Sequence, residues 1–321
     1  MKKILFNIIL ILFSFSSYAQ QFTEINRLVP GDRKEGDEFG TSVDVHEKYA
    51  IVGAIDEDED ASGGNTLNRA GAAYIFEQND EGDWIEVQKI VASDREEGDE
   101  FGFDVAIHGH YAVVSTPDKS DGWSNYEGIA YVFERDNSGA WNEVTQLSAF
   151  NPASGDEFGY SVDIHGDYIA VGARYEEDDE AGYNDIEEAG SVFIFKRDED
   201  DGWDESDKVV ASDRSMEDLF GAAVAISGDY LCVGAYKDGD GVNEGNVLNN
   251  AGSAYIFERQ DNDEWMEVQK IVASDREADD TYGKEVDISG TYAVIAANLE
   301  DHEPGDGTSI SATGAAYIYE K

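Results

Sequence analysis

The chain has 321 residues and carries 71 acidic against 22 basic side chains, a formal net charge of −49. This charge argues against nucleic acid and anionic membrane surfaces as partners, because both attract proteins through positive charge. Cations and cationic partners fit it better, although the same charge is also typical of a surface that is simply well solvated. A single cysteine, Cys232, excludes an internal disulfide.

The first 19 residues have the pattern of a secretory signal. Lys2 and Lys3 precede an apolar run from Ile4 to Phe15, and small residues follow up to Ala19. We expect cleavage near Ala19 and a secreted or extracytoplasmic protein, residues 20–321, that forms one domain and is a monomer. No later stretch approaches the roughly 20 apolar residues that a transmembrane helix needs. Removing the two lysines leaves 20 basic against 71 acidic residues.

The rest of the chain repeats one pattern of strands. The mature chain opens with a predicted strand, Phe22–Val29, and each repeat then follows the same order. A strand with period-two alternation (Ser42–His46) is followed by a tight turn and a second strand (Tyr49–Gly53). A long polar loop leads to a third strand (Ala72–Glu77), and another turn leads to a fourth (Trp84–Val91). Four short strands per repeat, rich in β-branched and aromatic residues, indicate the blade of a β-propeller.

Motifs at constant spacing define five repeats. An aromatic-glycine step recurs at intervals of 62, 57, 62 and 62 residues, a small pair follows each aromatic residue after 14 residues, and a large ring precedes it by 17. The steps begin at Phe39, Phe101, Phe158, Phe220 and Tyr282, the small pairs at Gly53, Ser115, Gly172, Gly234 and Ala296, and the rings are Phe22, Trp84, Trp141, Trp203 and Trp265. A fixed period of this kind marks a repeat architecture.

The two ends of the chain complement each other. The last repeat stops after its third strand, Ala315–Glu320, whereas Phe22–Val29 matches a fourth strand with no strands of its own repeat before it. We therefore predict an all-β, five-bladed propeller of four-stranded antiparallel blades. In this prediction the N-terminal strand completes the last blade and closes the ring, so that no blade is left with an open edge.

With these motifs in view, the chain resembles the FG-GAP repeat proteins of bacteria and, more distantly, the propeller of integrin α subunits. The resemblance covers residues 22–321 and implies a binding or adhesion module. Integrin propellers have seven blades and carry calcium loops in the hairpin between the first two strands. Here that hairpin is short, as in His46–Lys48, so this calcium site is not carried over.

Acidic residues gather in the long loops between second and third strands. Hard cations such as Ca²⁺ take six to eight oxygen ligands, which flexible loops rich in Asp and Asn can supply. The candidate ligands are Asp238, Asp240, Asn243 and Glu244 in the fourth repeat and Asp56, Asp58 and Asp60 in the first. Calcium is therefore the one expected cofactor, and the alternative is that these loops are solvated.

Three further features have both a functional and an architectural interpretation. Asp and Asn pairs recur between repeats, for example Asp94 with Asp99, and we interpret them as turn caps. Carboxylates on first strands, Asp44, Asp104, Asp163, Glu285 and Asp287, suggest the alternative of a carbohydrate-active enzyme with an acidic channel. His46, His108 and His165 recur at one turn, and we interpret them as turn residues rather than metal ligands.

The second repeat breaks the symmetry. Its long loop is five residues shorter and contains Trp123 and Tyr126. Aromatic residues beside polar groups can bind a protein or a sugar ring, and the alternative is that Trp123 covers apolar surface. We thus expect a non-enzymatic binding module for a protein or glycan ligand, which acts through an acidic loop face.

Overall fold

A computed structural model describes residues 24–119, 127–183, 185–242, 247–301 and 312–321. The described residues form five antiparallel sheets, which we call blades 1 to 5, with an inner, second, third and outer strand. Blade 1 contains β1 (Phe39–His46), β2 (Tyr49–Ala54), β3 (Ala72–Gln78) and β4 (Trp84–Ile90); blade 2 contains β5 (Val105–His108), β6 (Tyr111–Thr116), β7 (Ile129–Arg135) and β8 (Trp141–Leu147). Blade 3 contains β9 (Phe158–His165), β10 (Tyr168–Ala173), β11 (Ser191–Arg197) and β12 (Trp203–Val209); blade 4 contains β13 (Phe220–Ser227), β14 (Tyr230–Ala235), β15 (Ser253–Arg259) and β16 (Trp265–Ile271); blade 5 contains β17 (Tyr282–Ser289), β18 (Tyr292–Ala297) and β19 (Ala315–Glu320).

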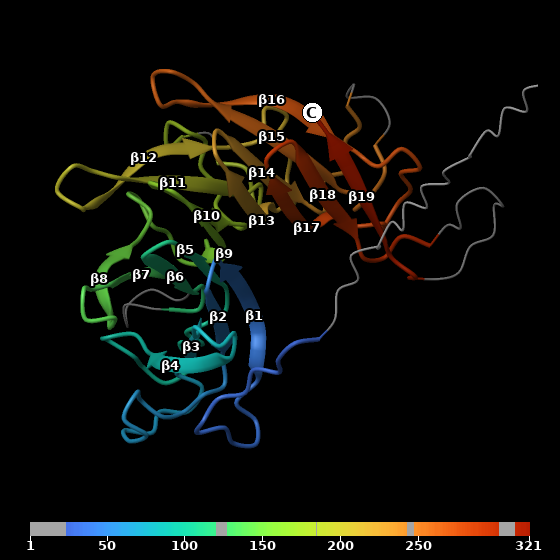
Figure 1. Cartoon of the computed structure of the whole chain (residues 1–321). Helices are drawn as coiled ribbons and strands as arrows, with labels where there is room; N and C mark the ends of the chain where they lie inside the picture. The colour runs from blue at the N-terminus through green and yellow to red at the C-terminus, as the bar shows by residue number, and fades with distance from the viewer. Residues whose placement is uncertain (1–23, 120–126, 184, 243–246, 302–311) are drawn as a thin grey trace, which may run out of the picture.

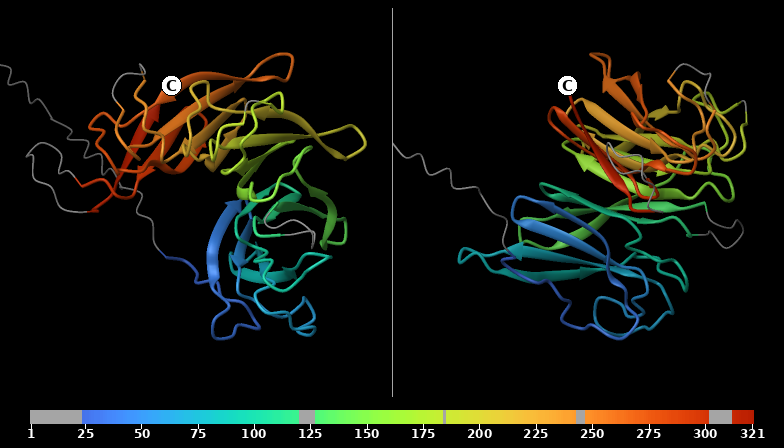
Figure 2. Two further views of the ribbon diagram at one scale, coloured as in Figure 1. Left: turned by 180° about the vertical axis from the view of Figure 1, so that it is seen from behind. Right: turned by 90° about the vertical axis from the view of Figure 1, so that its right-hand side faces the viewer.

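The blades follow one another in chain order around an axis (Figures 1 and 2). Contacts between inner strands join β1 to β5, β5 to β9, β9 to β13 and β13 to β17. This arrangement confirms the predicted all-β, five-bladed propeller of mainly four-stranded sheets. Within the described ranges, no helix is long and apolar enough to cross a membrane.

The glycine motifs mark the places where backbones of neighbouring blades meet. A Cβ atom on Gly53, at the end of β2, would lie 2.1 Å from the carbonyl oxygen of Gly102 in blade 2. Gly102 itself has a φ of 97°, a conformation that L side chains rarely adopt. Gly172 and Gly221 repeat this contact between blades 3 and 4. The constant spacing of the small pair from the aromatic-glycine step is therefore the spacing of interblade contacts.

The hydrophobic core is divided into layers between neighbouring blades. The aromatic residue of the last four steps is buried there; Phe101, for example, is fully buried and meets Tyr131 edge to face, with ring centroids 5.4 Å apart. The tryptophan that begins an outer strand packs on the tyrosine that begins the second strand of the preceding blade. This contact joins Tyr49 to Trp141, Tyr111 to Trp203 and Tyr168 to Trp265.

The last blade differs from the other four. The described part of its sheet contains three strands, in the order β17-β18-β19, and residues 24–30 form no strand. The predicted closure of the ring by an N-terminal strand is thus not shown. Residues 1–23, which include the predicted signal sequence and Phe22, lie outside the described residues.

Candidate functional site

Two sets of loops form one face of the propeller, which we call the loop face. One set consists of the long loops between second and third strands, and the other consists of the interblade loops. Backbone hydrogen bonds join them: Gly98 N donates to Asn68 O (2.9 Å), and Asp279 N donates to Asn249 O (2.8 Å). The interblade aspartates cap turns as predicted, since Asp99 accepts from Glu96 N (2.7 Å) and Asp280 from Glu277 N (2.6 Å).

In the first long loop, the three predicted calcium ligands have other partners. Asp56 accepts from the Nε of Arg69 (2.8 Å), and Asp58 accepts from the backbone N of Arg69 (2.9 Å). Asp60 accepts from the hydroxyl of Ser62 (2.6 Å) and from Gly64 N (3.0 Å). These hydrogen bonds, that of Ser62 above all, lower the pKa of Asp60 to about 2. Each carboxylate therefore stabilises the loop.

The fourth long loop holds its first acidic residue away from solvent. Asp238 is 1% exposed, lies 2.6 Å from the Nζ of Lys270 and accepts from the hydroxyl of Tyr255 (2.8 Å). Asp240 lies farther out and accepts from Ser215 (3.5 Å). The other two candidates of this loop, Asn243 and Glu244, lie outside the described residues, as do Trp123 and Tyr126 of the second repeat.

The described residues do not assemble a calcium cage. Among them, no group of three or more His, Cys, Asp or Glu side chains is placed to hold a metal. Asp238 is poorly placed to bind Ca²⁺, because the ammonium group of Lys270 already lies 2.6 Å from its carboxylate. The calcium prediction thus stays a prediction.

A buried ion pair under the loop face was missed from the sequence. The acidic residue that follows the small pair by three positions meets a lysine of the outer strand, as in Glu57 with Lys89 (3.1 Å) and Glu176 with Lys208 (3.2 Å). In blade 2, Lys119 takes the acidic position and pairs with Asp99 (2.7 Å). The sequence carries this signal, because in blades 1, 3 and 4 the acidic residue stands three positions after the small pair and the lysine stands five positions after the tryptophan of the outer strand.

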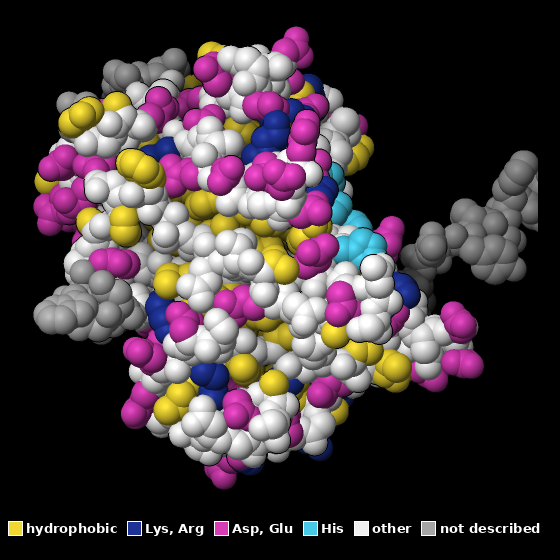
Figure 3. All heavy atoms as spheres, turned by 90° about the vertical axis from the view of Figure 1, so that its left-hand side faces the viewer, with side chains coloured by type: hydrophobic (Ala, Val, Ile, Leu, Met, Phe, Trp, Pro, Cys, Tyr) yellow, Lys and Arg dark blue, Asp and Glu magenta, His cyan; other side chains and the backbone are white. Residues whose placement is uncertain are grey.

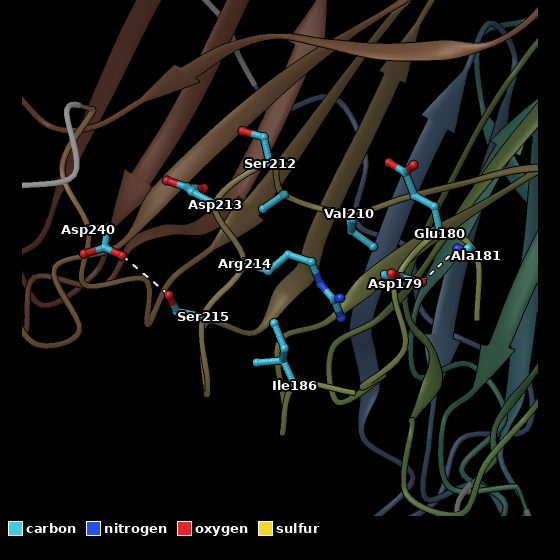
Figure 4. Close-up of a pocket in the computed structure, with 11 residues that line it drawn as sticks. Asp179, Glu180, Ala181, Ile186, Val210, Ser212, Asp213, Arg214, Ser215 and Asp240 are labelled. Carbon is cyan, nitrogen blue, oxygen red and sulfur yellow. Dashed lines mark hydrogen bonds between the residues drawn. The ribbon is translucent and has the colours of Figure 1, made fainter. Parts of the chain in front are cut away.

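A cavity of about 620 Å³ opens on the loop face between blades 3 and 4. Figure 4 shows Glu180 and Asp179 from one long loop, Asp213 and Arg214 from the interblade loop, and Asp240 from the next long loop. Asp179 caps the turn at Ala181 N (2.9 Å), and Asp213 is bound by Lys270 (2.6 Å). Burial, followed by the neighbouring Asp207 and Asp179, raises the pKa of Glu180. The lining thus contains four carboxylates and one guanidinium, and two of these carboxylates, Asp179 and Asp213, already have partners.

The inner-strand carboxylates join blades together. Asp44 accepts from Ile107 N of the next blade (2.6 Å), Asp104 from Val162 N (2.8 Å) and Asp163 from Ile226 N (2.6 Å). Each also accepts from the backbone N of the residue after it. Burial raises the pKa of Asp104 to about 7 and that of Asp163 to about 8. Both oxygens of each carboxylate are thus used by the backbone.

Three histidines stack on the opposite face. The ring centroids of His46 and His108 lie 4.0 Å apart, and those of His108 and His165 lie 4.6 Å apart. Figure 3 shows histidine side chains gathered at one place on a surface where acidic side chains are spread widely. Burial and the two neighbouring rings lower the pKa of His108 to about 4. The rings pack together at the ends of β1, β5 and β9, directly before the turns to which the sequence interpretation assigned them.

Comparison with protein families identifies the repeat. The model of the FG-GAP repeat matches residues 22–76, 84–133, 141–195, 203–257 and 265–319. Each of the last four matches runs from an outer strand into the third strand of the blade that follows it. None of the curated proteins matches the chain.

Proposed function

The chain belongs to the FG-GAP repeat family, and from this premise we propose that it is a secreted, non-enzymatic binding or adhesion module. Its loop face is the binding surface, and the ligand is a protein or glycan that presents cationic groups. The observation that carries this proposal is the cavity between blades 3 and 4, where Glu180 and Asp240 stand beside two further carboxylates. A cationic side chain gains from such a cavity, and the overall negative charge attracts it over longer distances.

The state of the inner-strand carboxylates supports a non-enzymatic role. Glycoside hydrolysis needs a proton donor and a second carboxylate free to act on the substrate or on water. By contrast, both oxygens of each inner-strand carboxylate accept hydrogen bonds from backbone N–H groups in Asp44, Asp104 and Asp163. The carbohydrate-active alternative would therefore depend on Glu285 and Asp287, which are exposed.

A peptide-binding experiment tests the proposal. A lysine-rich fluorescent peptide should bind the mature protein, and Glu180→Gln combined with Asp240→Asn should weaken binding several-fold. Asp80→Asn combined with Glu81→Gln, at an exposed turn on the opposite face, is the charge-matched control and should bind like the parent. Equal binding by both variants would contradict the assignment of the surface. Repeating the titration with millimolar Ca²⁺ and with chelator tests the calcium prediction.

We propose in addition that the ring closes through the N-terminal segment. Residues 24–31 make, on blade 1, two of the contacts that an outer strand makes on the following blade. Asn26 donates to Trp84 O (3.4 Å), as its equivalent Gln88 does to Trp141 O (2.7 Å). Gly31 N donates to Glu86 (2.7 Å), as its equivalent Ser93 N does to Glu143 (2.9 Å).

The surfaces that closure would cover are apolar. Val43 and Val45 on β1 are 68% and 62% exposed, and Tyr292 and Ile318 of blade 5 are 51% and 75% exposed. Docking blade 5 against blade 1 would place Tyr292 against Trp84, which repeats the tyrosine–tryptophan contact of the other blades. Pairing of residues 22–28 with β19 would remove the free edge of blade 5.

A further inference from the structure

A second cavity, of about 480 Å³, lies on the axis of the propeller and is lined by residues of all five blades. The residue after each aromatic-glycine step lines it, and this position differs from blade to blade. The five residues are Thr41, Phe103, Tyr160, Ala222 and Lys284. The backbone repeats at this position, whereas the side chains differ. The repeat alone therefore does not determine which chemical groups line the cavity.

One wall of this axial cavity is aromatic. Phe103 and Tyr160 have ring centroids 5.3 Å apart and are half-buried. The guanidinium carbon of Arg174 lies 3.6 Å from the centroid of Tyr160, and its Nε donates to Glu157 (2.8 Å). This stacking on one face holds the Tyr160 ring in place. A fixed, half-exposed aromatic wall suits the flat apolar face of a ring-shaped ligand.

A lysine stands beside this wall. The Nζ of Lys284 lies 4.1 Å from the ring centroid of Tyr236 and 5.9 Å from that of Tyr160. Eight other lysines form ion pairs: Lys34, Lys48, Lys89, Lys119, Lys196, Lys208, Lys270 and Lys321. For Lys284, no carboxylate of the described chain lies within ion-pair distance. In so acidic a protein, an ammonium with aromatic neighbours marks a place suited to an external anion.

The other polar groups of the axial cavity are few. Asp104 lines it, but its oxygens accept from backbone N–H groups. Glu285 also lines it and lies next to Lys284 in the chain. Ser42 donates its hydroxyl to Gly102 O (3.2 Å), and Ser161 donates to Gly221 O (2.8 Å). Lys284 is thus the cationic group of the lining, and the volume lies in the range of pockets for small ligands.

We propose that the axial cavity binds a carboxylated sugar residue of the hexuronic acid type. Lys284 pairs with the carboxylate, and the C–H face of the sugar ring packs on Phe103 and Tyr160. This site is separate from the cation-binding cavity between blades 3 and 4, and the two take ligands of opposite charge. A partner that carries both kinds of group could engage both sites, but neither site requires the other.

Calorimetric titration with a trisaccharide of galacturonic acid tests the proposal at fixed ionic strength. The acidic trisaccharide should bind, and a neutral galactose trisaccharide should bind at least tenfold more weakly. Lys284→Ala should lose at least tenfold in affinity, whereas Lys284→Arg should stay within about threefold of the parent. Lys237→Ala, a half-buried lysine outside the cavity lining, is the matched control and should bind normally.

Three outcomes would overturn the inference: equal binding of the neutral sugar, unchanged affinity of Lys284→Ala, or binding of benzoate but not of the trisaccharide. Thermal melting of each variant separates lost affinity from lost folding, and Phe103→Leu supplies an independent change of the aromatic wall. Glu180→Gln with Asp240→Asn should leave this titration unchanged. Failure of the peptide experiment and failure of this one are therefore distinguishable.

Discussion

Tyr168 of β10 and Trp265 of β16 meet edge to face across the boundary between blades 3 and 4, with ring centroids 5.8 Å apart. Their partners extend the contact: the guanidinium carbon of Arg259 lies 4.8 Å from the centroid of Tyr168, and Tyr168 donates to Asp263 (2.8 Å). An outer strand is thus fastened to the preceding blade by its first residue. This explains why a large ring recurs 17 residues before each aromatic-glycine step.

Replacing Trp265 should strongly destabilise the propeller. Trp265 is 5% exposed, and removal of a buried tryptophan side chain typically costs about 3–5 kcal/mol. We expect Trp265→Ala to lower the free energy of unfolding by this amount in urea titrations. The neighbouring Met266 is 54% exposed, and Met266→Ala should change stability by less than about 0.5 kcal/mol. Similar losses of stability for both variants would contradict this role of the contact between Tyr168 and Trp265.

Asp163 should contribute to stability as a link between blades 3 and 4. In Asp163→Ala, the N–H groups of Ile164 and Ile226 lose their acceptor, which costs about 1–3 kcal/mol when such groups are buried. Alanine suits the strand itself, since Ala225 occupies the equivalent position in blade 4. Asp80→Ala, at an exposed turn, is the control. If Asp163→Ala unfolds at the same urea concentration as this control, the carboxylate has no linking role.

The buried pair of Asp238 and Lys270 should be sensitive to loss of one partner. Lys270→Met leaves Asp238 and Asp213 together without their ammonium, and breaking a buried pair in this way typically costs about 3–5 kcal/mol. Lys34 forms an exposed ion pair with Glu59, so Lys34→Met should leave the melting temperature close to that of the parent. Differential scanning calorimetry compares the two, and a Lys270→Met protein as stable as Lys34→Met would refute the structural role.

The histidine stack should make stability depend on pH. The pKa of His108 is lowered to about 4, whereas an unfolded histidine titrates near 6.5. Between these values the unfolded state binds more protons, so the contribution to folding is complete above about pH 6.5 and is lost as the pH falls toward 4. Because the ring is partly exposed, we expect a loss of roughly 1 kcal/mol.

Urea titrations at pH 7.5 and pH 5 measure this effect. His108→Gln should show a smaller loss of stability between the two pH values than the parent protein. His110→Gln is the control, because His110 is exposed and lies outside the stack. A parent and a His108→Gln variant with the same pH dependence would contradict the assignment.

The architecture could be predicted from the sequence because the repeat supplies many independent signals for one contact. Gly53 and Gly102, for example, are far apart in the chain but touch in the structure, and their spacing recurs through the chain. Strands with alternating apolar and polar residues, joined by turns at constant places in the repeat, then indicate the four-stranded blade. The role of Asp238 was harder to predict, because an acidic loop has the same composition whether its carboxylates bind a cation, water or a buried lysine. Only the position of Lys270 decides between these.

The axial cavity could not be predicted from composition. Phe103, Tyr160 and Lys284 come from three repeats, and each is unremarkable in its own segment. Their proximity follows from the angle between blades, which no local pattern encodes. The signal that could have found them is the residue after each aromatic-glycine step, where five equivalent positions hold five different residues.

Disulfide trapping of the N-terminal segment tests ring closure most directly. In blade 4, Ile256 pairs with Gln269, and the same register places Asn26 opposite Ile318 once residues 22–28 join β19. Oxidation of the double variant Asn26→Cys, Ile318→Cys should give an intramolecular disulfide, seen as a mobility shift without reductant, at the yield of the control pair Ile256→Cys, Gln269→Cys. A control pair that cross-links while residues 26 and 318 do not would contradict the closed five-bladed ring.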